Sequence, residues 1–323
     1  MGYYNRNVRA TDGDGVVLVR IPIPDAEEMD LRIMPEADIL VAIAGHVDGV
    51  PRLLFSSTDP PFQIHEYVEG SVVNARWPRG VRLPQQVVPA VVRLLQQLPA
   101  VPRHVLPAIH RPWPRDGDTV SFGRALSDAT QRVYERFRER YRWALSEFHV
   151  PREPLRGVRE RWLGMKPRPF SLVHADLHRK NMILTTDEVV FIDWELSLWG
   201  DPLYDLAVHI SKMGYLDDER EWLIREWLRA MPSAATADWA DGLSAYLLHE
   251  QVKDALVNCF RYLRLFEEGR LSVDEQEQFV GKLTAKIASA HLAWYGTDVR
   301  VPHRDIVRAT LRRAARLRPM FSM

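Results

Sequence analysis

The feature that most constrains this chain is a polar loop flanked by two short apolar segments near the middle of its 323 residues. The apolar segments, residues 171–173 and 189–192, are predicted to be strands because they are short runs with few polar side chains. Four side chains that carry chemistry follow these segments: His174, Asp176, Asn181 and Asp193. We therefore expect one tight loop to be held beside a carboxylate that ends the neighbouring strand.

This arrangement of residues suits phosphoryl transfer, which depends mainly on positioning and on charge neutralisation. One carboxylate must face the attacking hydroxyl, orient it and accept its proton. A second carboxylate and an amide oxygen must hold Mg²⁺ against the nucleotide phosphates. Asp176, Asn181 and Asp193 can supply these three groups, and the spacing from Asp176 to Asn181 matches that of the protein-kinase catalytic loop.

Three motifs, in this order, resemble those of the aminoglycoside phosphotransferase family, which is related to the choline kinases and to the protein-kinase fold. They are HADLHRKN over residues 174–181, IDWE over 192–195 and WGDPLYDLA over 199–207. The resemblance implies an α+β, bilobal, protein-kinase-like fold. A small β-rich N-lobe with one helix is expected over residues 1–69, and a large helical C-lobe with the catalytic loop and substrate site over residues 70–323.

The resemblance also implies a role for each residue of the motifs. Asp176 is expected to be the catalytic base, and Asn181 and Asp193 are expected to bind Mg²⁺. His174 and Asp205 are expected to support the loop.

Four further residues of the motifs have less definite expectations. His178 is expected in the site without a fixed role, and Glu195 is expected to stand near the metal. Arg179 and Lys180 replace a pair that is often Pro-Gly in relatives, and they are expected either to meet substrate or phosphate or to face solvent.

The nucleotide site is expected in the first 70 residues, with ATP as cofactor. Arg20 stands where relatives usually present a lysine to the phosphates, and Glu36 is its expected partner; a surface arginine and a solvated helix position are the alternatives. Arginine keeps the charge and can bind phosphate in a fork. The segment that includes Glu66 and Val68 resembles the hinge that binds adenine through its main chain. Residues 2–7 are expected to form the loop over the phosphates.

Elsewhere the hydrophobic pattern predicts the remaining elements. An Asp-Gly-Asp-Gly turn over residues 12–15 predicts a hairpin. Helical spacing predicts helices over residues 31–44, 87–98 and 119–148. The chain is expected to be helical from residue 202 onward, with breaks near Gly214, Pro232, Gly269 and Pro302.

Composition and absent motifs narrow the class of protein. No P-loop, dinucleotide-binding, nucleophile-elbow or HExxH motif occurs. No apolar run is long enough to span a membrane, no signal-peptide core is present, and Cys259 is the single cysteine. We expect a soluble, cytoplasmic monomer or homodimer with no nucleic-acid or membrane partner.

Charge distribution bears on the acceptor. Residues 71–170 carry a net charge of +11, which should repel a polycation such as an aminoglycoside. We therefore expect a neutral or partly anionic acceptor, such as a nucleoside or macrolide-type antibiotic. The alternatives are a housekeeping kinase for a sugar or amino alcohol and a non-catalytic nucleotide-binding protein on the same fold.

Overall fold

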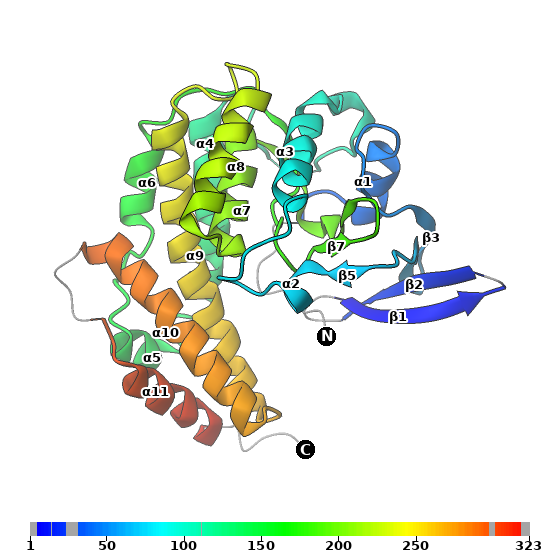
Figure 1. Cartoon of the computed structure of the whole chain (residues 1–323). Helices are drawn as coiled ribbons and strands as arrows, with labels where there is room; N and C mark the ends of the chain where they lie inside the picture. The colour runs from blue at the N-terminus through cyan, green and yellow to red at the C-terminus, as the bar shows by residue number, and fades with distance from the viewer. Residues whose placement is uncertain (1–4, 14, 24–31, 111, 297–300, 318–323) are drawn as a thin grey trace. The chain divides into compact units, whose positions relative to one another are not determined.

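The structure is a computed structural model that describes residues 5–13, 15–23, 32–110, 112–296 and 301–317 (Figure 1). The chain forms two compact units. The first comprises residues 1–122 and 165–243, and the second comprises residues 123–164 and 244–323. The expected lobe boundary at residues 69 and 70 stays a prediction, since the compact units group the chain differently.

The first unit begins with a four-stranded antiparallel sheet in the order β1-β2-β4-β3. Its strands are β1 (Asn5–Asp12), β2 (Gly15–Pro22), β3 (Leu53–Thr58) and β4 (Pro61–Glu66). Figure 1 shows β1 and β2 as a hairpin, and the turn uses Gly13 at a φ of 58°, where a glycine is unstrained. The predicted hairpin is confirmed.

The loop expected over residues 2–7 is only partly testable. Residues 2–4 lie outside the described residues. Residues 5–7 belong to β1, so the expectation of a loop is wrong for them. The reason is that β2 offers a partner to every residue of β1, from Asn5 opposite Pro22 to Asp12 opposite Gly15.

One helix, α1 (Glu36–Ile43), follows this hairpin in the chain and buries Ile39, Leu40 and Ile43. It is shorter than the predicted helix over residues 31–44. The residue before a proline disfavours the helical region, so the helix does not extend to the residues before Pro35. Pro35 itself is extended, with ψ of 135°, and the helix begins at the next residue. Residues 24–31 lie outside the described residues.

Short strands surround the polar loop. They are β5 (Ser71–Val72), β6 (Ser171–Val173), β7 (Met182–Leu184), β8 (Val189–Phe191) and β9 (Leu198–Gly200). The strands pair in the orders β5-β7-β8 and β6-β9. Both predicted strands therefore form, and each pairs with a short strand that the sequence pattern did not indicate.

The remaining helices of the first unit are α2 (Val73–Arg76), α3 (Val87–Gln97), α7 (Pro202–Met213) and α8 (Asp217–Ala230), with the 3₁₀ turns η1 (Leu98–Ala100), η2 (Arg103–Val105) and η3 (Trp194–Leu196). Helix α3 packs against α7 and α8. Just before α7, a Cβ on Gly200 would lie 2.3 Å from the Phe122 ring, so this position requires glycine. The close approach fixes the start of α7 against an aromatic cluster.

The second unit is helical. Its elements are α5 (Arg142–Glu147), α6 (Arg156–Trp162), α10 (Val273–Tyr295) and α11 (Arg304–Arg316), together with most of α4 (Thr119–Phe137) and α9 (Trp239–Glu268). The predicted helix over residues 119–148 is wrong as a single helix. Tyr141 leaves helical geometry, at φ −107° and ψ 19°, and buries its ring against Phe137 and Phe260.

The long helices after residue 202 end near the predicted breaks. Within the described part of the chain, no helix is long and apolar enough to cross a membrane.

Candidate active site

The β7–β8 hairpin brings Asn181 and Asp193 together. Met182 pairs with Phe191 in the strand register, and the Ile192 N–H donates to the Asn181 carbonyl at 3.0 Å. Asn181 therefore stands opposite Ile192, one residue from Asp193. Asn181 and Asp193, which are twelve positions apart in the sequence, thus meet at one end of a short hairpin.

Asp176 lies at the centre of the loop with both carboxylate oxygens engaged. The Asn181 amide nitrogen donates to Asp176 Oδ2 at 3.1 Å and to the Asp176 carbonyl at 3.0 Å. The ammonium of Lys212 contacts Oδ1. Burial raises the pKa of Asp176, but Lys212 and His178 outweigh it and the net pKa is lowered. Asp176 is therefore ionised at neutral pH and can act as an acceptor for a hydroxyl proton.

The backbone before Asp176 is held by Asp205 in the first turn of α7. The N–H groups of His174 and Ala175 donate to Asp205 Oδ2 and Oδ1 at 2.8 and 2.9 Å. Ala175 has a φ of 59°, in the left-handed region that is unfavourable for alanine. The two charge-assisted hydrogen bonds offset the cost of this conformation, directly before Asp176.

His174 is buried and links the loop to the strand that precedes Asp193. Its Nε2 donates to the Ile192 carbonyl at 3.2 Å, and its Nδ1 accepts from the Asp176 N–H at 3.3 Å. The ring also packs on Trp194, with 4.5 Å between centroids. These contacts make His174 a brace between the two halves of the site.

One face of α7 supplies three contacts to the loop, and the sequence analysis found only the first. Asp205 binds the loop backbone, His209 Nδ1 donates to the Leu177 carbonyl at 3.0 Å, and Lys212 reaches Asp176. These residues are four and three positions apart, the spacing that places side chains on one helix face. Helical spacing counted onward from Asp205 could have identified His209 and Lys212.

Both expectations for Arg179 are wrong. The side chain neither faces solvent nor is available to phosphate, because it is buried and donates to five backbone carbonyls at 2.7–3.3 Å. Those carbonyls belong to Trp77, Pro78, Val81, Met213 and Gly214. A planar guanidinium with five donors suits such a task, and it ties the loop to the end of α7.

The two residues on either side of Arg179 are more accessible. Lys180 is exposed. His178 lies with its Nε2 3.6 Å from Asp176 Oδ2, and its Nδ1 accepts from the Lys180 N–H at 3.1 Å. Burial lowers the pKa of His178, and the charge of Asp176 acts against that shift.

Arg20 is buried and bridges two carboxylates. Its Nη2 lies 2.6 Å from Asp193 Oδ1 and 3.3 Å from Glu36 Oε2. Burial lowers the pKa of Arg20, but Glu36 and Asp193 more than compensate, so the guanidinium stays charged. Glu36 in turn accepts from the Trp194 N–H at 3.0 Å. The Arg20 guanidinium thus links β2 to Asp193 and to Glu36 on α1. Glu36 extends this link to the backbone of Trp194.

Glu195 is a third acidic side chain at this position. It is buried, and the Asn5 amide donates to its Oε2 at 2.9 Å. Burial, together with the nearby charge of Asp193, raises the pKa of Glu195. The structure therefore places Glu195 beside Asp193, with a link to β1.

The expected hinge leaves β4 and continues into β5, which pairs with β7. The Glu66 N–H donates to the Arg52 carbonyl at 2.9 Å, and the Glu66 side chain is about half exposed. Among the described residues, no backbone carbonyl accepts from the Val68 N–H. A Cβ on Gly70 would lie 2.5 Å from the Leu184 carbonyl, so the segment passes tightly along β7.

The donor set fits Mg²⁺ by its chemistry. In the described part of the chain, no group of three or more His, Cys, Asp or Glu residues could hold a metal alone. Asn181 uses its amide nitrogen on Asp176, which leaves the amide oxygen for another partner, and the Asp193 carboxylate is 30% exposed. One carboxylate and one amide oxygen match the few protein ligands that Mg²⁺ takes beside phosphate oxygens.

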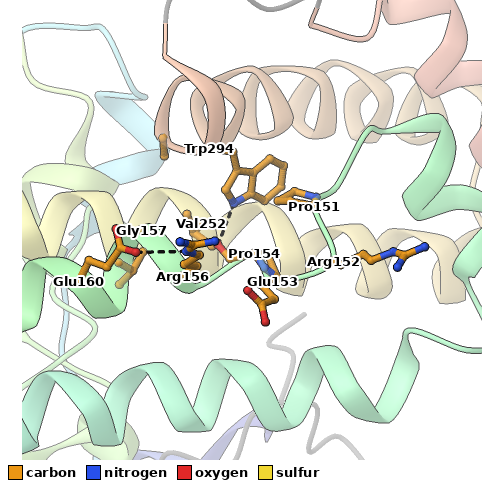
Figure 2. A pocket seen from close by; sticks show the side chains of 11 residues that line it. Pro151, Arg152, Glu153, Pro154, Arg156, Gly157, Glu160, Val252 and Trp294 are labelled. Carbon is orange, nitrogen blue, oxygen red and sulfur yellow. Dashed lines mark hydrogen bonds and ion pairs between the residues drawn. The ribbon is translucent and has the colours of Figure 1, made fainter.

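A pocket of about 670 Å³ lies elsewhere, in the second unit (Figure 2). Its lining includes Arg156 and Glu160, which pair with each other at 3.1 Å, and Trp294, which donates to the Pro154 carbonyl at 2.9 Å. None of the residues expected in the site lines it. This pocket is therefore not the candidate site.

Comparison with known proteins gives one family match. The model of a family described as "Phosphotransferase enzyme family" matches residues 1–240. These residues contain every side chain of the candidate site.

Solved structures match over most of the chain. A choline/ethanolamine kinase family protein from Mesorhizobium loti has a TM-score of 0.55 at 16% identity, covering 97% of this chain and 94% of that one. Macrolide 2′-phosphotransferase MphH from Brachybacterium faecium has a TM-score of 0.52 at 19% identity, covering 93% and 92%. A thermostable mutant of aminoglycoside phosphotransferase APH(4)-Ia, in a ternary complex with AMP-PNP and hygromycin B, has a TM-score of 0.55 at 16% identity, covering 92% and 93%.

Likeness at this level of identity establishes the fold. The expected α+β, protein-kinase-like fold, with a small strand-rich part and a large helical part, is confirmed. Among curated proteins, Protein LicA of Haemophilus influenzae is 37% identical over 54 residues, which are 17% of this chain. That match spans about a fifth of the length of the curated relative.

Proposed function

Because this chain belongs to the phosphotransferase enzyme family, we propose that it transfers a phosphoryl group from ATP to a hydroxyl of a small molecule. The observation that carries the proposal is Asp176. Asn181 and Lys212 hold this ionised carboxylate in place. Asn181 belongs to the same loop and also stands beside Asp193. An ionised acceptor next to a two-oxygen cation site is the arrangement that phosphoryl transfer needs.

Asp176 orients the acceptor hydroxyl and takes its proton. The acceptor oxygen forms its bond to phosphorus as the bond between phosphorus and the leaving oxygen breaks, and the electron pair of that bond stays with ADP. The proton moves to Asp176 and then to solvent. The lowered pKa of Asp176 makes it a weak base, which suits a late proton transfer in a loose transition state.

Asn181 and Asp193 are the residues that would hold Mg²⁺. When bound, MgATP supplies the phosphoryl group and the cation that neutralises its charge. The amide of Asn181 is fixed by its hydrogen bonds to Asp176, so its oxygen has a defined direction. Glu195 lies close to Asp193, on the same side of the site.

Arg20 is the residue that would steady the phosphates. Its charge is secured by Glu36 and by Asp193, and its Nε is buried without a hydrogen-bond partner in the structure. The Val68 N–H and the backbone near Glu66 would bind the adenine ring. His174 and Asp205 keep the loop in place without touching substrate.

For the acceptor we propose a neutral or partly anionic antibiotic, of nucleoside or macrolide type. The likeness to MphH supports an antibiotic acceptor, at the level of fold alone. A second candidate is an amino-alcohol or sugar kinase, which the likeness to a choline/ethanolamine kinase family protein favours. The net charge of residues 71–170 is weak support, because several of its arginines are paired, including Arg82 with Asp218 and Arg168 with Asp201.

The test is Mg²⁺-dependent ADP release across a panel of hydroxylated antibiotics and metabolites, with products identified by mass. We expect one class of acceptor to gain a single phosphoryl group with the wild-type protein and none with Asp176→Asn. Phosphorylation that persists in Asp176→Asn, or ADP release without any phosphorylated product, contradicts the proposal.

A further inference from the structure

Lys212 contacts the carboxylate that the proposed function places against the acceptor. We propose that Lys212 stands on the acceptor side of Asp176 and selects neutral or anionic acceptors against cationic ones. This inference rests on the proposed function, because it assigns a specificity residue to the same site.

The two oxygens of Asp176 face different partners. Oδ2 receives the Asn181 amide at 3.1 Å and lies 3.6 Å from His178 Nε2. Oδ1 contacts the Lys212 ammonium. Asn181 adjoins Asp193 through the β7–β8 hairpin, so Oδ2 is the oxygen on the cation-binding side. An acceptor that attacks in line comes from the side away from the leaving group, and it must share Oδ1 with Lys212.

Lys212 is positioned by the fold and remains within reach of a ligand. It lies in the last turn of α7, seven residues after Asp205, which binds the backbone of the same loop. Its carbonyl accepts from Arg79 Nη1 at 2.8 Å. The Lys212 side chain is 26% exposed and that of Asp176 is 18% exposed, so a small molecule can meet both.

The charge that Lys212 places beside Asp176 determines which acceptors bind more tightly. Lys212 places a positive charge in contact with Asp176 Oδ1, on the side that the acceptor must approach. An acceptor with a cation close to its hydroxyl would meet the Lys212 ammonium at short range, and an acceptor with an anion there would be attracted. Lys212 is also part of an ion pair, but its charge stands at the reacting carboxylate itself.

Three small alcohols test this directly. Choline, 3,3-dimethylbutan-1-ol and isethionate share a hydroxyethyl group and carry a positive, no and a negative charge respectively. Their dissociation constants are measured by titration of the full chain saturated with Mg²⁺ and AMP-PNP, and their phosphorylation with ATP is followed by mass. Both measurements are repeated with Lys212→Met and Lys212→Arg.

We expect the wild-type protein to bind isethionate and the neutral alcohol more tightly than choline. Lys212→Met should shift the choline-to-isethionate affinity ratio toward choline by about 10-fold or more, since a charge at short range is removed. Lys212→Arg keeps the charge and should keep the order. The matched control is Lys166→Met, which removes the same charge from an exposed lysine outside the loop and α7 and should leave the ratio unchanged.

A wild-type preference for choline overturns the inference, as does a ratio that Lys212→Met leaves unchanged while all three alcohols weaken together. Failure of all three alcohols to bind at roughly 0.1 M also contradicts the inference, because the inference requires an acceptor site that is open to small alcohols. The expected charge order without phosphoryl transfer to any alcohol on the wider panel would instead overturn the proposed function.

Discussion

Asp205 accepts hydrogen bonds from the N–H groups of both His174 and Ala175, so one carboxylate on α7 holds the backbone that aims Asp176. Burial raises the pKa of Asp205, and the two N–H donors act against that rise by favouring the charged form. The contact makes the loop that carries Asp176 dependent on a helix whose N-cap, Asp201, lies 26 residues after Ala175.

Asp205→Asn should weaken both the fold and the reaction. The amide offers one acceptor oxygen to two N–H groups, and its own NH₂ would face the second donor. We expect a loss of about 2–3 kcal/mol in the free energy of unfolding. A displaced loop should also lower kcat by about 100-fold. Urea unfolding and steady-state kinetics measure the two effects, and Asp187→Asn, an exposed isosteric change, is the control. Wild-type kcat in Asp205→Asn would contradict the role given to this residue.

Arg20 should be needed for nucleotide binding and for stability. Arg20→Met leaves Glu36 and Asp193 without their shared cation, and breaking a buried pair in this way costs about 3–5 kcal/mol. Arg20→Lys keeps the charge but loses the fork, so we expect the Kd for MgATP to rise about 10-fold. Calorimetry measures the Kd, and Arg93→Met removes an exposed arginine as a control. The account fails here if Arg20→Met binds MgATP as tightly as the wild type.

Arg179 should act on stability and leave phosphate binding intact. Arg179→Lys retains the charge, but its ammonium has three donors for five carbonyls, so we expect a loss of about 2–4 kcal/mol in unfolding free energy. The KM for ATP of the folded enzyme should stay within about threefold of the wild type. Lys180→Met, at the exposed neighbour, should change stability by less than about 0.5 kcal/mol. A large rise in KM with unchanged stability would place Arg179 on the phosphates after all.

His209 should make the fold sensitive to acid. Its ring is buried, donates to the Leu177 carbonyl and accepts from the Tyr215 hydroxyl at 2.6 Å, and burial lowers its pKa to about 3. The unfolded chain binds a proton near pH 6.5 and the folded chain does not, so stability falls as pH drops from about 6.5 toward 3. The loss from this residue should reach about 2 kcal/mol at pH 5.

The matched variant for that measurement is His209→Asn, which keeps a donor near the Leu177 carbonyl and cannot titrate. We expect the difference in unfolding free energy between the wild type and this variant to shrink as pH falls from 7 to 5. Curves that stay parallel over that range would show that His209 does not carry the effect.

Much of the fold was predictable because its causes are local. The turn at Gly13 and the apolar segments at residues 171–173 and 189–192 depend on short-range pattern, and each appears where expected. The break at Tyr141 was not predictable, because the residues around it have ordinary helical character. There the packing of Tyr141 on Phe260, more than 100 positions away, outweighs local helix formation.

The residues of the candidate site were likewise predictable only where the signal was local in the sequence. The residues in the loop motif and after β8 could be named because their order and spacing carry the chemistry. Arg179 was misjudged because its charge suggests the surface, while its donors are used by carbonyls that only the fold assembles around it. Lys212 was missed because nothing near it in the sequence marks it, and only its distance from Asp205 along α7 connects it to Asp176.

The most direct test of the central claim is to separate turnover from nucleotide binding at Asp176 and Asp193. The Kd for MgATP is measured by calorimetry, and phosphoryl transfer to the best acceptor is measured by mass, for the wild type, Asp176→Asn and Asp193→Ala. The account predicts that Asp176→Asn binds MgATP within about threefold of the wild type while kcat falls by at least about 1,000-fold, and that Asp193→Ala loses both. Near-normal turnover in Asp176→Asn, or normal MgATP binding in Asp193→Ala, would contradict it.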